Sequence, residues 1–406
     1  MNLWKLSFKY VFRRWGGALL TVIVGALGLA LIGTVMNLAD EVPAAVKKAL
    51  GGADMVVGPK GSELDLVMCC ALHITPTRGL MSYRAAAEAV ANPYVKASAP
   101  VALGDSYNGT RILWTRPDIV NIYDAHLAQG RMWTGAMEAV VGAEAARAQH
   151  LKLGSEMIST HGLDIGGELH RNASYRVVGI LKPNGSVIDR LILADLKSIR
   201  VVHVDVADPD EQGPTQVAGQ GYDKDGNPIA ISAMLAKFSS PIAAAITPRQ
   251  ISTTTELTAA NPLLEMARLS ALARPMFNLM ILFGVLFGVV AALMAAIGLV
   301  SALNQRAKDL AVLRILGASR TKVARVALQE SLILVHLAFF VGLGFMVALG
   351  VIVGDKMLSY GLLVPAWPGL REVGILYAGS LATALLASLV PVIRVAMSNA
   401  EDGLKA

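Results

Sequence analysis

Two adjacent cysteines and a nearby histidine give one short segment the residue types that bind soft metal ions. The segment is "CCALH", with Cys69, Cys70 and His73, and thiolate and imidazole are common zinc ligands. A bridge between neighbouring cysteines needs a strained ring that ordinary disulfides avoid, so we do not expect one here. Because a free cysteine is usually a small buried apolar residue, we interpret the pair as part of a core and predict no metal site.

A second group of possible metal ligands surrounds His203. His203 and Asp205 alternate along "RVVHVDV" (200–206), which we interpret as a strand, and three acids follow at Asp208, Asp210 and Glu211. No third ligand is fixed by spacing, so the pattern favours a solvated loop edge. "DKDG" (223–226) resembles the start of a calcium loop but lacks the later ligands and the terminal Glu, which indicates a turn.

The sequence contains no nucleotide phosphate-binding loop motif. No G-x-x-x-x-G-K-[ST] loop occurs, and "GPKG" (58–61) has the wrong spacing for one. We therefore expect no cofactor in this chain.

The composition indicates the class of protein to which these residues belong. Of the 406 residues 54% are hydrophobic and 16% are charged, which is too apolar for an ordinary soluble protein of this length. About 20 apolar residues cross a bilayer. Four stretches meet that length, and we expect transmembrane helices at 16–38, 275–303, 331–354 and 373–393.

Basic residues flanking these stretches predict their orientation, because Lys and Arg stay on the cytoplasmic side. Both termini are then cytoplasmic. The predicted cytoplasmic pieces, which hold 12 basic and 4 acidic residues, are 1–15, 304–330 and 394–406. Since the rest of the chain has 24 basic and 26 acidic residues, the net charge of +6 is a topology signal and not a nucleic-acid-binding patch.

The segments on the opposite side are a large domain at 39–271 and a short loop at 355–372. The domain is long enough to fold by itself. "EVPAAVKKAL" (41–50) predicts a helix that continues the first span and stops at Gly51, and residues 262–280 predict a helix that runs into the second span. Between these two stalks, short β-branched runs alternate with helical stretches, which predicts an α+β domain. The expected strands include 111–114, 138–142, 175–181 and 200–206, and the expected helices include 83–90 and 143–151.

A basic segment between the second and third spans has the most distinctive pattern. We expect a helix from Gln305 to Leu316, ended by Gly317, and a second helix that starts near Ser319. The first helix is apolar on most sides and must be enclosed. Either the membrane boundary encloses it, with basic side chains directed to lipid phosphates, or a groove on a cytosolic partner does.

This segment resembles the FtsX/MacB/LolC superfamily of ABC transporter permeases. The similarity is carried by "NQRAKDLAVLRILGASRTKVARVALQESLIL" (304–334), which contains the pattern R-x-L-G-A-S. Residues 139–185 resemble the superfamily's periplasmic core domain, and "PVIRVAMSNAEDGLK" (391–405) resembles its C-terminal signature. The resemblance implies a 1+3 arrangement of four transmembrane helices with an α+β MacB-like periplasmic domain on two stalk helices.

The resemblance also implies a partner and a mechanism. The basic segment would be the coupling helix that contacts a separate cytosolic ABC ATPase dimer, which binds ATP and Mg. A second permease copy, the bacterial inner membrane and a periplasmic partner or substrate complete the expected assembly. The chain would itself be no enzyme and would serve export or extraction of a periplasmic or membrane-derived substrate. An FtsX-like regulator of periplasmic enzymes and an ATPase-independent scaffold are the alternatives. The residues assigned to the ATPase contact are Arg306, Lys308, Asp309, Leu310, Leu313, Arg314, Leu316, Gly317, Ala318 and Ser319.

Overall fold

The chain divides into two compact units. The first comprises Met1–Val42, Leu272–Ser359 and Val364–Ala406, and the second comprises Pro43–Ala271 and Tyr360–Leu363. The computed structural model describes residues 3–13, 15–76, 79–162, 169–203, 221, 228–305 and 319–397.

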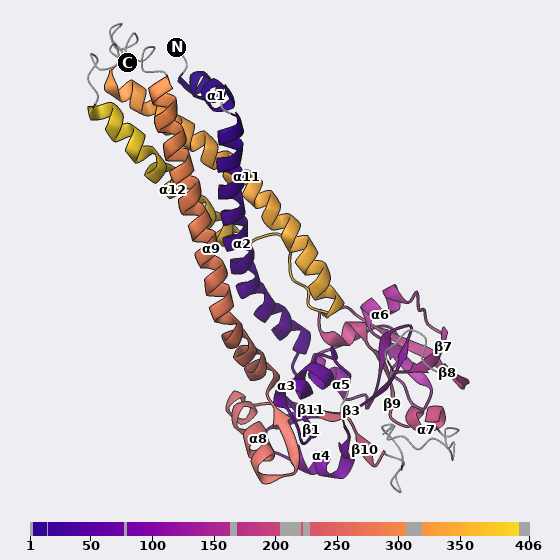
Figure 1. The fold of residues 1–406 in the computed structure, drawn as a ribbon. Helices are drawn as coiled ribbons and strands as arrows, with labels where there is room; N and C mark the ends of the chain where they lie inside the picture. Colours follow the sequence, from indigo (N-terminus) through magenta and orange to yellow (C-terminus); the bar gives the residue numbers. More distant parts are fainter. Residues whose placement is uncertain are drawn as a thin grey trace, which may run out of the picture. The chain divides into compact units, whose positions relative to one another are not determined.

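Long apolar helices form the first unit (Figure 1). Within the described residues, four helices are long and apolar enough to cross a membrane. One precedes the second unit in the chain and three follow it, which confirms the predicted 1+3 arrangement. These helices are α2 (Trp15–Leu50), α9 (Pro262–Gln305), α11 (Arg320–Ser359) and α12 (Leu370–Met397).

Small residues let the four helices approach closely. A Cβ at Gly28 of α2 would lie 2.8 Å from the carbonyl oxygen of Gly284 of α9, so the absent side chain is what allows this contact. All four helices also contribute to a shared buried apolar cluster. Its buried residues include Val22, Ala295, Leu334, Ala338 and Ala387.

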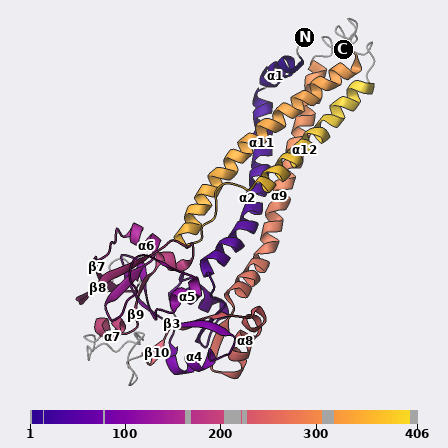
Figure 2. The same ribbon diagram turned by 180° about the vertical axis from the view of Figure 1, so that it is seen from behind.

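The ends of the helices in the first unit are arranged consistently. The last turns of α9 and α12 and the first turn of α11 lie at the same end of the bundle as α1 (Leu3–Arg13), as two opposite views show (Figures 1 and 2). Helix α1 packs on the bundle through Val11, which is buried, while Trp4, Phe8 and Phe12 are exposed. This spacing of four residues places the three aromatic rings on one face of α1.

A mixed sheet with flanking helices forms the second unit. Its ten strands, counted over the described residues, follow the order β12-β1-β11-β3-β4-β9-β6-β8-β5, and β7 pairs with both β3 and β8. Only the β4–β9 and β6–β8 pairs in that sheet are parallel. The strands are β1 (Met55–Pro59), β3 (Val95–Tyr107), β4 (Thr110–Thr115), β5 (Leu127–Gly130), β6 (Glu138–Val141), β7 (Glu156–His161), β8 (Leu169–Leu181), β9 (Ile192–Asp195), β11 (Ala233–Phe238) and β12 (Leu257–Ala260), with a separate pair β2 (Met81–Ser82) and β10 (Ala230–Ile231).

The sheet packs around two apolar cores. Trp114 and Tyr175 are central to one core, and Met55 and Phe238 belong to the other. Short helices cover both, and this mixture confirms the predicted α+β class. The helices are α3 (Glu63–Leu66), η1 (Val67–Ala71), α4 (Tyr83–Ala89), α5 (Ile119–Tyr123), α6 (Ala143–Ala148), η2 (Val187–Arg190), α7 (Ser198–His203) and α8 (Pro241–Thr254).

One predicted strand is wrong. Residues 200–206 were expected to be extended, but 198–203 form helix α7. Ile199 and Val202, three positions apart, are both buried while Val201 is exposed, which is the pattern of one helical face. A short run of β-branched residues fits a buried strand and a buried helical turn equally well by composition.

Candidate functional site

The predicted coupling segment lies almost entirely outside the described residues. The helix expected from Gln305 to Leu316 lies outside them as well, apart from Gln305, which ends α9. Ser319 is described and exposed, and its hydroxyl shares a hydrogen bond with Thr321 Oγ1 at 2.8 Å just before α11. The assigned residues outside the described part are Arg306, Lys308, Asp309, Leu310, Leu313, Arg314, Leu316, Gly317 and Ala318.

The two adjacent cysteines are not free thiols, contrary to prediction. Cys69 and Cys70 form a disulfide inside η1, a π-helical turn closed by a hydrogen bond from Leu72 N to Val67 O of 2.9 Å. This turn is wider than an α-helical turn, and the two bonded sulfurs belong to adjacent residues within it. The expectation that the pair belongs to a core is confirmed, because both are buried.

His73 does not join the cysteines in a ligand group. Its two ring nitrogens are buried and have no hydrogen-bond partner among the described residues. Burial, followed by the positive charges of Arg111 and Arg190, holds the pKa of His73 well below its ordinary value. His73 is therefore a neutral imidazole at neutral pH.

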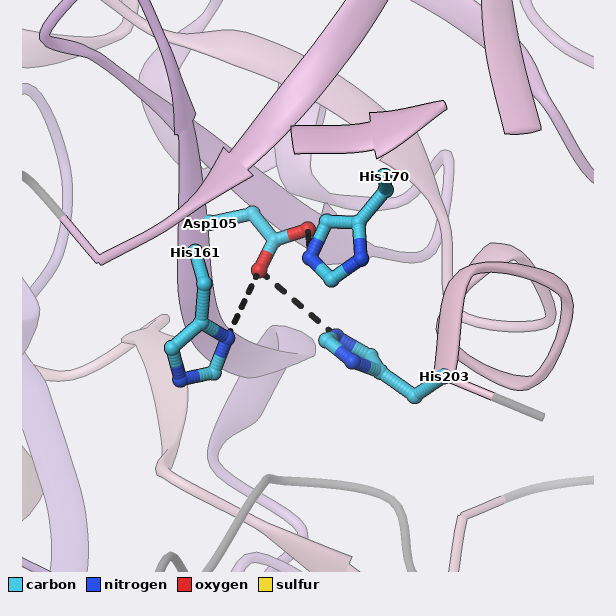
Figure 3. Close-up of side chains that lie close together, drawn as sticks. All are labelled: Asp105, His161, His170 and His203. Atoms are coloured by element: carbon cyan, nitrogen blue, oxygen red, sulfur yellow. Dashed lines mark ion pairs between the residues drawn. The ribbon is translucent and has the colours of Figure 1, made fainter. Parts of the chain in front are cut away.

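Four other side chains converge on one point of the α+β domain. Asp105, His161, His170 and His203, called here the Asp105 cluster, are the one group of possible metal ligands found within the described residues. Figure 3 shows the three imidazole rings gathered around the carboxylate of Asp105. The residues come from four elements, β3, β7, β8 and α7.

A β-bulge positions Asp105. Leu103 of β3 pairs with Leu113 of β4 and Ser106 pairs with Arg111, so two residues of β3 lie opposite one residue of β4. Such a bulge changes the direction of a strand's side chains and is common beside functional sites. Gly104, inside the bulge, would bring a Cβ to 3.2 Å from the Trp114 ring, so this position favours glycine.

Strand pairing brings two histidines to the same place. His161, the last residue of β7, lies directly across from Asp105. Thr160 pairs with Leu169 at the start of β8, which places His170 beside the end of β7. His203 is the last residue of α7.

Short distances connect the Asp105 cluster. His161 Nδ1 and His203 Nε2 each lie 3.6 Å from Asp105 Oδ1, and His170 Nε2 lies 3.4 Å from Oδ2. All four possible ligand atoms are within 4.8 Å of one another. The Asp105 side chain is fully buried, His170 and His203 are 9% and 10% exposed, and His161 is 39% exposed. His161 is therefore the solvent-facing member.

The charges in the Asp105 cluster are set by burial and by the neighbouring rings. Burial alone would raise the pKa of Asp105, but interactions with His161, His170 and His203 lower it to about 2. Burial lowers the pKa of His203 to about 4, although the charge of Asp105 acts in the opposite direction. At neutral pH Asp105 is an anion and His203 is a neutral imidazole.

Polar and aromatic groups support the cluster from behind. The Ser159 hydroxyl donates a hydrogen bond to Asp105 Oδ2 at 2.9 Å. The Trp114 ring meets the His203 ring edge-on, with centroids 5.8 Å apart, and Trp114 Nε1 donates to the Tyr175 hydroxyl at 2.8 Å. These contacts fix the orientation of the carboxylate and of one imidazole.

Sequence reasoning found one member of the Asp105 cluster and missed three. His203 was considered, but in a predicted strand and with other neighbours, and the pattern favoured a solvated loop edge. Its proposed neighbours Asp205, Asp208, Asp210 and Glu211 lie outside the described residues, as does the "DKDG" turn at 223–226. The available signal for two of the others was the pair His161 and His170, nine positions apart in the sequence and separated by a stretch that contains Gly162, Gly166 and Gly167, because short glycine-containing segments often separate two paired strands.

Comparison with known families decides what kind of chain carries this cluster. The family model of the MacB-like periplasmic core domain matches residues 18–249, more than half of the chain. The FtsX-like permease C-terminal model matches residues 281–400. The chain belongs to the FtsX/MacB-like family of ABC transporter permeases.

Solved structures of similar regions are distant from this permease. One is the periplasmic region of MacB from Actinobacillus actinomycetemcomitans, at 11% identity and a TM-score of 0.34, covering 55% of this chain and 95% of that one. Another is the extracellular domain of the noncanonic ABC-type transporter YknZ from Gram-positive bacteria, at 10% identity and a TM-score of 0.30, covering 50% of this chain and 98% of that one. No curated protein matches the sequence.

The two family matches divide the candidate sites between them. All four residues of the Asp105 cluster fall within the MacB-like match. The predicted coupling segment falls within the FtsX-like match. The permease is a membrane protein whose four apolar helices accompany a MacB-like domain.

Proposed function

We propose that the permease is the membrane subunit of a mechanotransmission-type ABC transporter. A separate cytosolic ABC ATPase dimer binds ATP and Mg and pushes on residues 306–319. Two permease copies, one for each ATPase subunit, pass this movement to their α+β domains in the periplasm. The movement acts on a periplasmic or membrane-derived substrate, and no solute has to cross between the spans.

The observation that supports this proposal most is the continuity of two helices. Helix α2 continues without a break from Trp15 to Leu50, and α9 from Pro262 to Gln305. Each includes an apolar stretch long enough to span a bilayer and a further part that belongs to the α+β unit. A continuous helix transmits a displacement along its hydrogen-bonded backbone better than a flexible linker does.

The end of α2 is fixed to the α+β unit by close contacts. The chain leaves the helix at Gly51, in a left-handed conformation with φ of +61°, where a Cβ would lie 2.8 Å from the Tyr123 ring. Lys237 Nζ donates to the carbonyls of Asn121 and Ile122 at 3.2 and 3.3 Å beside this turn. Motion of α2 would therefore reach α5 and β11.

The start of α9 is fixed by a polar cap and an ion-pair network. Asn261 Oδ1 accepts from Leu264 N at 3.1 Å, and Asn261 Nδ2 donates to the carbonyl of Ala244 in α8 at 3.1 Å. Arg268 of α9 pairs with Glu63 of α3 at 3.0 Å and with Glu265 at 2.5 Å. Helix α9 is thus attached to α8 and α3.

A third attachment comes from the loop between α11 and α12. Residues 360–363 belong to the α+β unit. Arg190 donates to the carbonyl of Tyr360 at 3.4 Å, and its guanidinium packs against Gly361, whose φ of +75° and missing side chain leave room for it. This loop gives α11 and α12 a route to the same domain.

The polar residues of the spans support the absence of a solute path. His336, the most prominent, bonds to the Leu332 carbonyl through Nδ1 at 2.6 Å and to the Tyr377 hydroxyl through Nε2 at 3.0 Å. One nitrogen is therefore bonded to the backbone of its own helix α11 and the other to Tyr377 of α12. An ion path through a bilayer usually needs polar groups that remain available to the ion.

Co-purification tests the proposal. The permease, expressed with the ABC ATPase from a neighbouring reading frame, retains the ATPase through purification. Leu313→Asp with Leu316→Asp abolishes this retention, because both apolar contacts become charged. Ile242→Asp is the matched control: Ile242 is 71% exposed in the first turn of α8, where an acid suits the helix dipole. A permease that purifies alone and functions without nucleotide is instead a scaffold.

A further inference from the structure

We propose that Asp105, His161, His170 and His203 form a binding site in the α+β domain for Zn²⁺ or a similar divalent transition-metal ion. The site does not depend on the proposed transport role. It requires only the MacB-like domain in which all four residues lie.

The donor set selects the metal. Three imidazole nitrogens and one carboxylate oxygen are ligands of Zn²⁺ and of neighbouring transition metals, whereas Ca²⁺ and Mg²⁺ prefer sets made only of oxygen. The separation of the ligands along the chain is also informative. The four residues extend over the sequence from Asp105 to His203 and come from four different elements, which an incidental cluster at a loop edge does not require.

The distances match a tetrahedral shell. Ligand bonds of 2.0–2.2 Å give a tetrahedron with edges of about 3.4 Å. His161 Nδ1 and His203 Nε2 each lie 3.6 Å from Asp105 Oδ1, close to this value, and His170 Nε2 lies 3.4 Å from Oδ2 of the same carboxylate. The largest separation, within 4.8 Å, closes with modest rotation of the imidazole rings.

The unpaired atoms of the cluster are those that would bind the metal. Asp105 Oδ1, His170 Nε2 and His203 Nε2 are buried and have no hydrogen-bond partner among the described residues. Burying an unpaired polar atom is unfavourable. A metal ion bound by all three atoms would remove the free-energy cost of burying them unpaired. A single hydrogen bond would satisfy only one of the three atoms.

The surroundings provide a second shell and an entrance. Ser159 donates to Asp105 Oδ2, which orients the carboxylate and leaves Oδ1 facing His161 and His203. Hydrogen bonds of this kind orient ligands in known metal sites. His161 is 39% exposed, so an ion reaches the cluster past its ring.

The complete ligand set indicates a structural or regulatory role. Four protein ligands fill a tetrahedral shell, whereas catalytic zinc sites keep a position for water. A bound ion joins β3, β7, β8 and the end of α7. The stability of this part of the domain therefore depends on the metal.

Metal binding is tested on the full-length permease in detergent, purified without a histidine tag. After removal of metal with a chelator, Zn²⁺ alone is titrated in competition with a chromophoric chelator, and bound zinc is counted by elemental analysis. The wild type binds one Zn²⁺ per chain. His161→Ala, the change at the most exposed ligand, weakens binding by more than about 100-fold, and Ser159→Ala weakens it by about 10- to 100-fold, as changes to orienting groups do.

Three controls keep the test decisive. His126→Ala changes a 73% exposed histidine of the same domain that pairs with Asp124 and leaves Zn²⁺ affinity unchanged. Co²⁺ in the wild type gives the intense visible bands of a tetrahedral site, and His161→Ala abolishes them while the far-ultraviolet circular dichroism stays the same. Unchanged Zn²⁺ binding in both His161→Ala and Asp105→Asn overturns the proposal, and so does a wild type that binds no Zn²⁺ at micromolar concentration.

Discussion

The indole Nε1 of Trp114 donates a hydrogen bond of 2.8 Å to the hydroxyl of Tyr175, and both side chains are completely buried. The pair lies in the core cluster that includes strands β4 and β8. Because the Trp114 ring also meets the His203 ring edge-on, the pair forms part of the wall behind the Asp105 cluster. A buried polar pair of this kind fixes the packing of the aromatic rings around it.

The Trp114–Tyr175 bond makes a prediction for stability. Tyr175→Phe leaves the indole N–H buried without a partner and is expected to destabilise the permease by about 1–3 kcal/mol. Trp114→Phe removes the donor and a larger part of the core, and is expected to cost more. Chemical denaturation of the detergent-solubilised protein, followed by tryptophan fluorescence and circular dichroism, measures both.

A double-mutant cycle isolates the hydrogen bond from the loss of packing. Trp114→Phe with Tyr175→Phe is expected to cost less than the sum of the single changes, because no orphaned donor or acceptor remains. Tyr94→Phe, at a 56% exposed position, is the control and changes stability by less than about 0.5 kcal/mol. Additive single effects would contradict the prediction.

Loss of the Tyr123 hydroxyl is expected to have the opposite effect on stability from loss of the Tyr175 hydroxyl. Its hydroxyl is buried with no hydrogen-bond partner among the described residues, and burial raises the pKa of this phenol well above its ordinary value. Tyr123→Phe removes an unsatisfied polar group and keeps the ring against Gly51, so it is expected to be neutral or to stabilise the protein. A loss of more than about 1 kcal/mol in the same denaturation assay would show that the hydroxyl has a partner.

Substitutions of Asn261, which caps α9, are expected to lower stability by different amounts. Asn261→Ala removes the acceptor for Leu264 N and the donor to Ala244, and is expected to destabilise the α+β domain by about 1 kcal/mol or more. Asn261→Asp keeps the cap but loses the bond to Ala244, so its effect is expected to be smaller. Hydrogen exchange of the amides at 263–266 measures both variants. Equal exchange in the two variants would mean that the cap contributes nothing.

Metal binding predicts a stability that depends on zinc. An ion at 100 times its dissociation constant stabilises the folded state by about 2.7 kcal/mol, which raises the melting temperature of a domain of this size by roughly 5 to 10 °C. Thermal unfolding of the chelator-treated permease with and without Zn²⁺ measures this shift. The shift is expected to vanish in His161→Ala and to persist in His126→Ala. A shift of equal size in both variants would place the ion elsewhere.

Much of the fold is predictable from the sequence because its signals are local. Apolar length is sufficient to find the four long helices, since a bilayer fixes how many residues must be apolar. Stops such as Gly51 and starts such as Pro262 define the ends of α2 and α9. The strand predicted at 200–206 was wrong, since 198–203 form helix α7, because so short a run is not enough to establish a period.

The Asp105 cluster could not be predicted in the same way. Its members are brought together by a bulge in β3 and by the pairing of β7 with both β3 and β8, and pairing over such distances leaves no periodic trace in the sequence. Asp105 itself lies in "VALGDSY" without another ligand nearby. Only Gly104 marks the position, because glycine within a strand often signals a bulge.

The proposed topology predicts which side of the membrane each position faces. Ser319→Cys places a thiol at an exposed residue just before α11, and Tyr94→Cys places one at a 56% exposed residue of the α+β domain. The native Cys69–Cys70 disulfide has no thiolate to react with a maleimide, so unreduced wild type is the blank. In intact cells with a permeabilised outer membrane, a membrane-impermeant maleimide is expected to label Tyr94→Cys and not Ser319→Cys, and disruption of the inner membrane exposes both. Labelling of Ser319→Cys in intact cells would put residues 306–319 in the periplasm, where no cytosolic ATPase could act on them. That result would contradict the proposed function but would leave the proposed metal site unaffected.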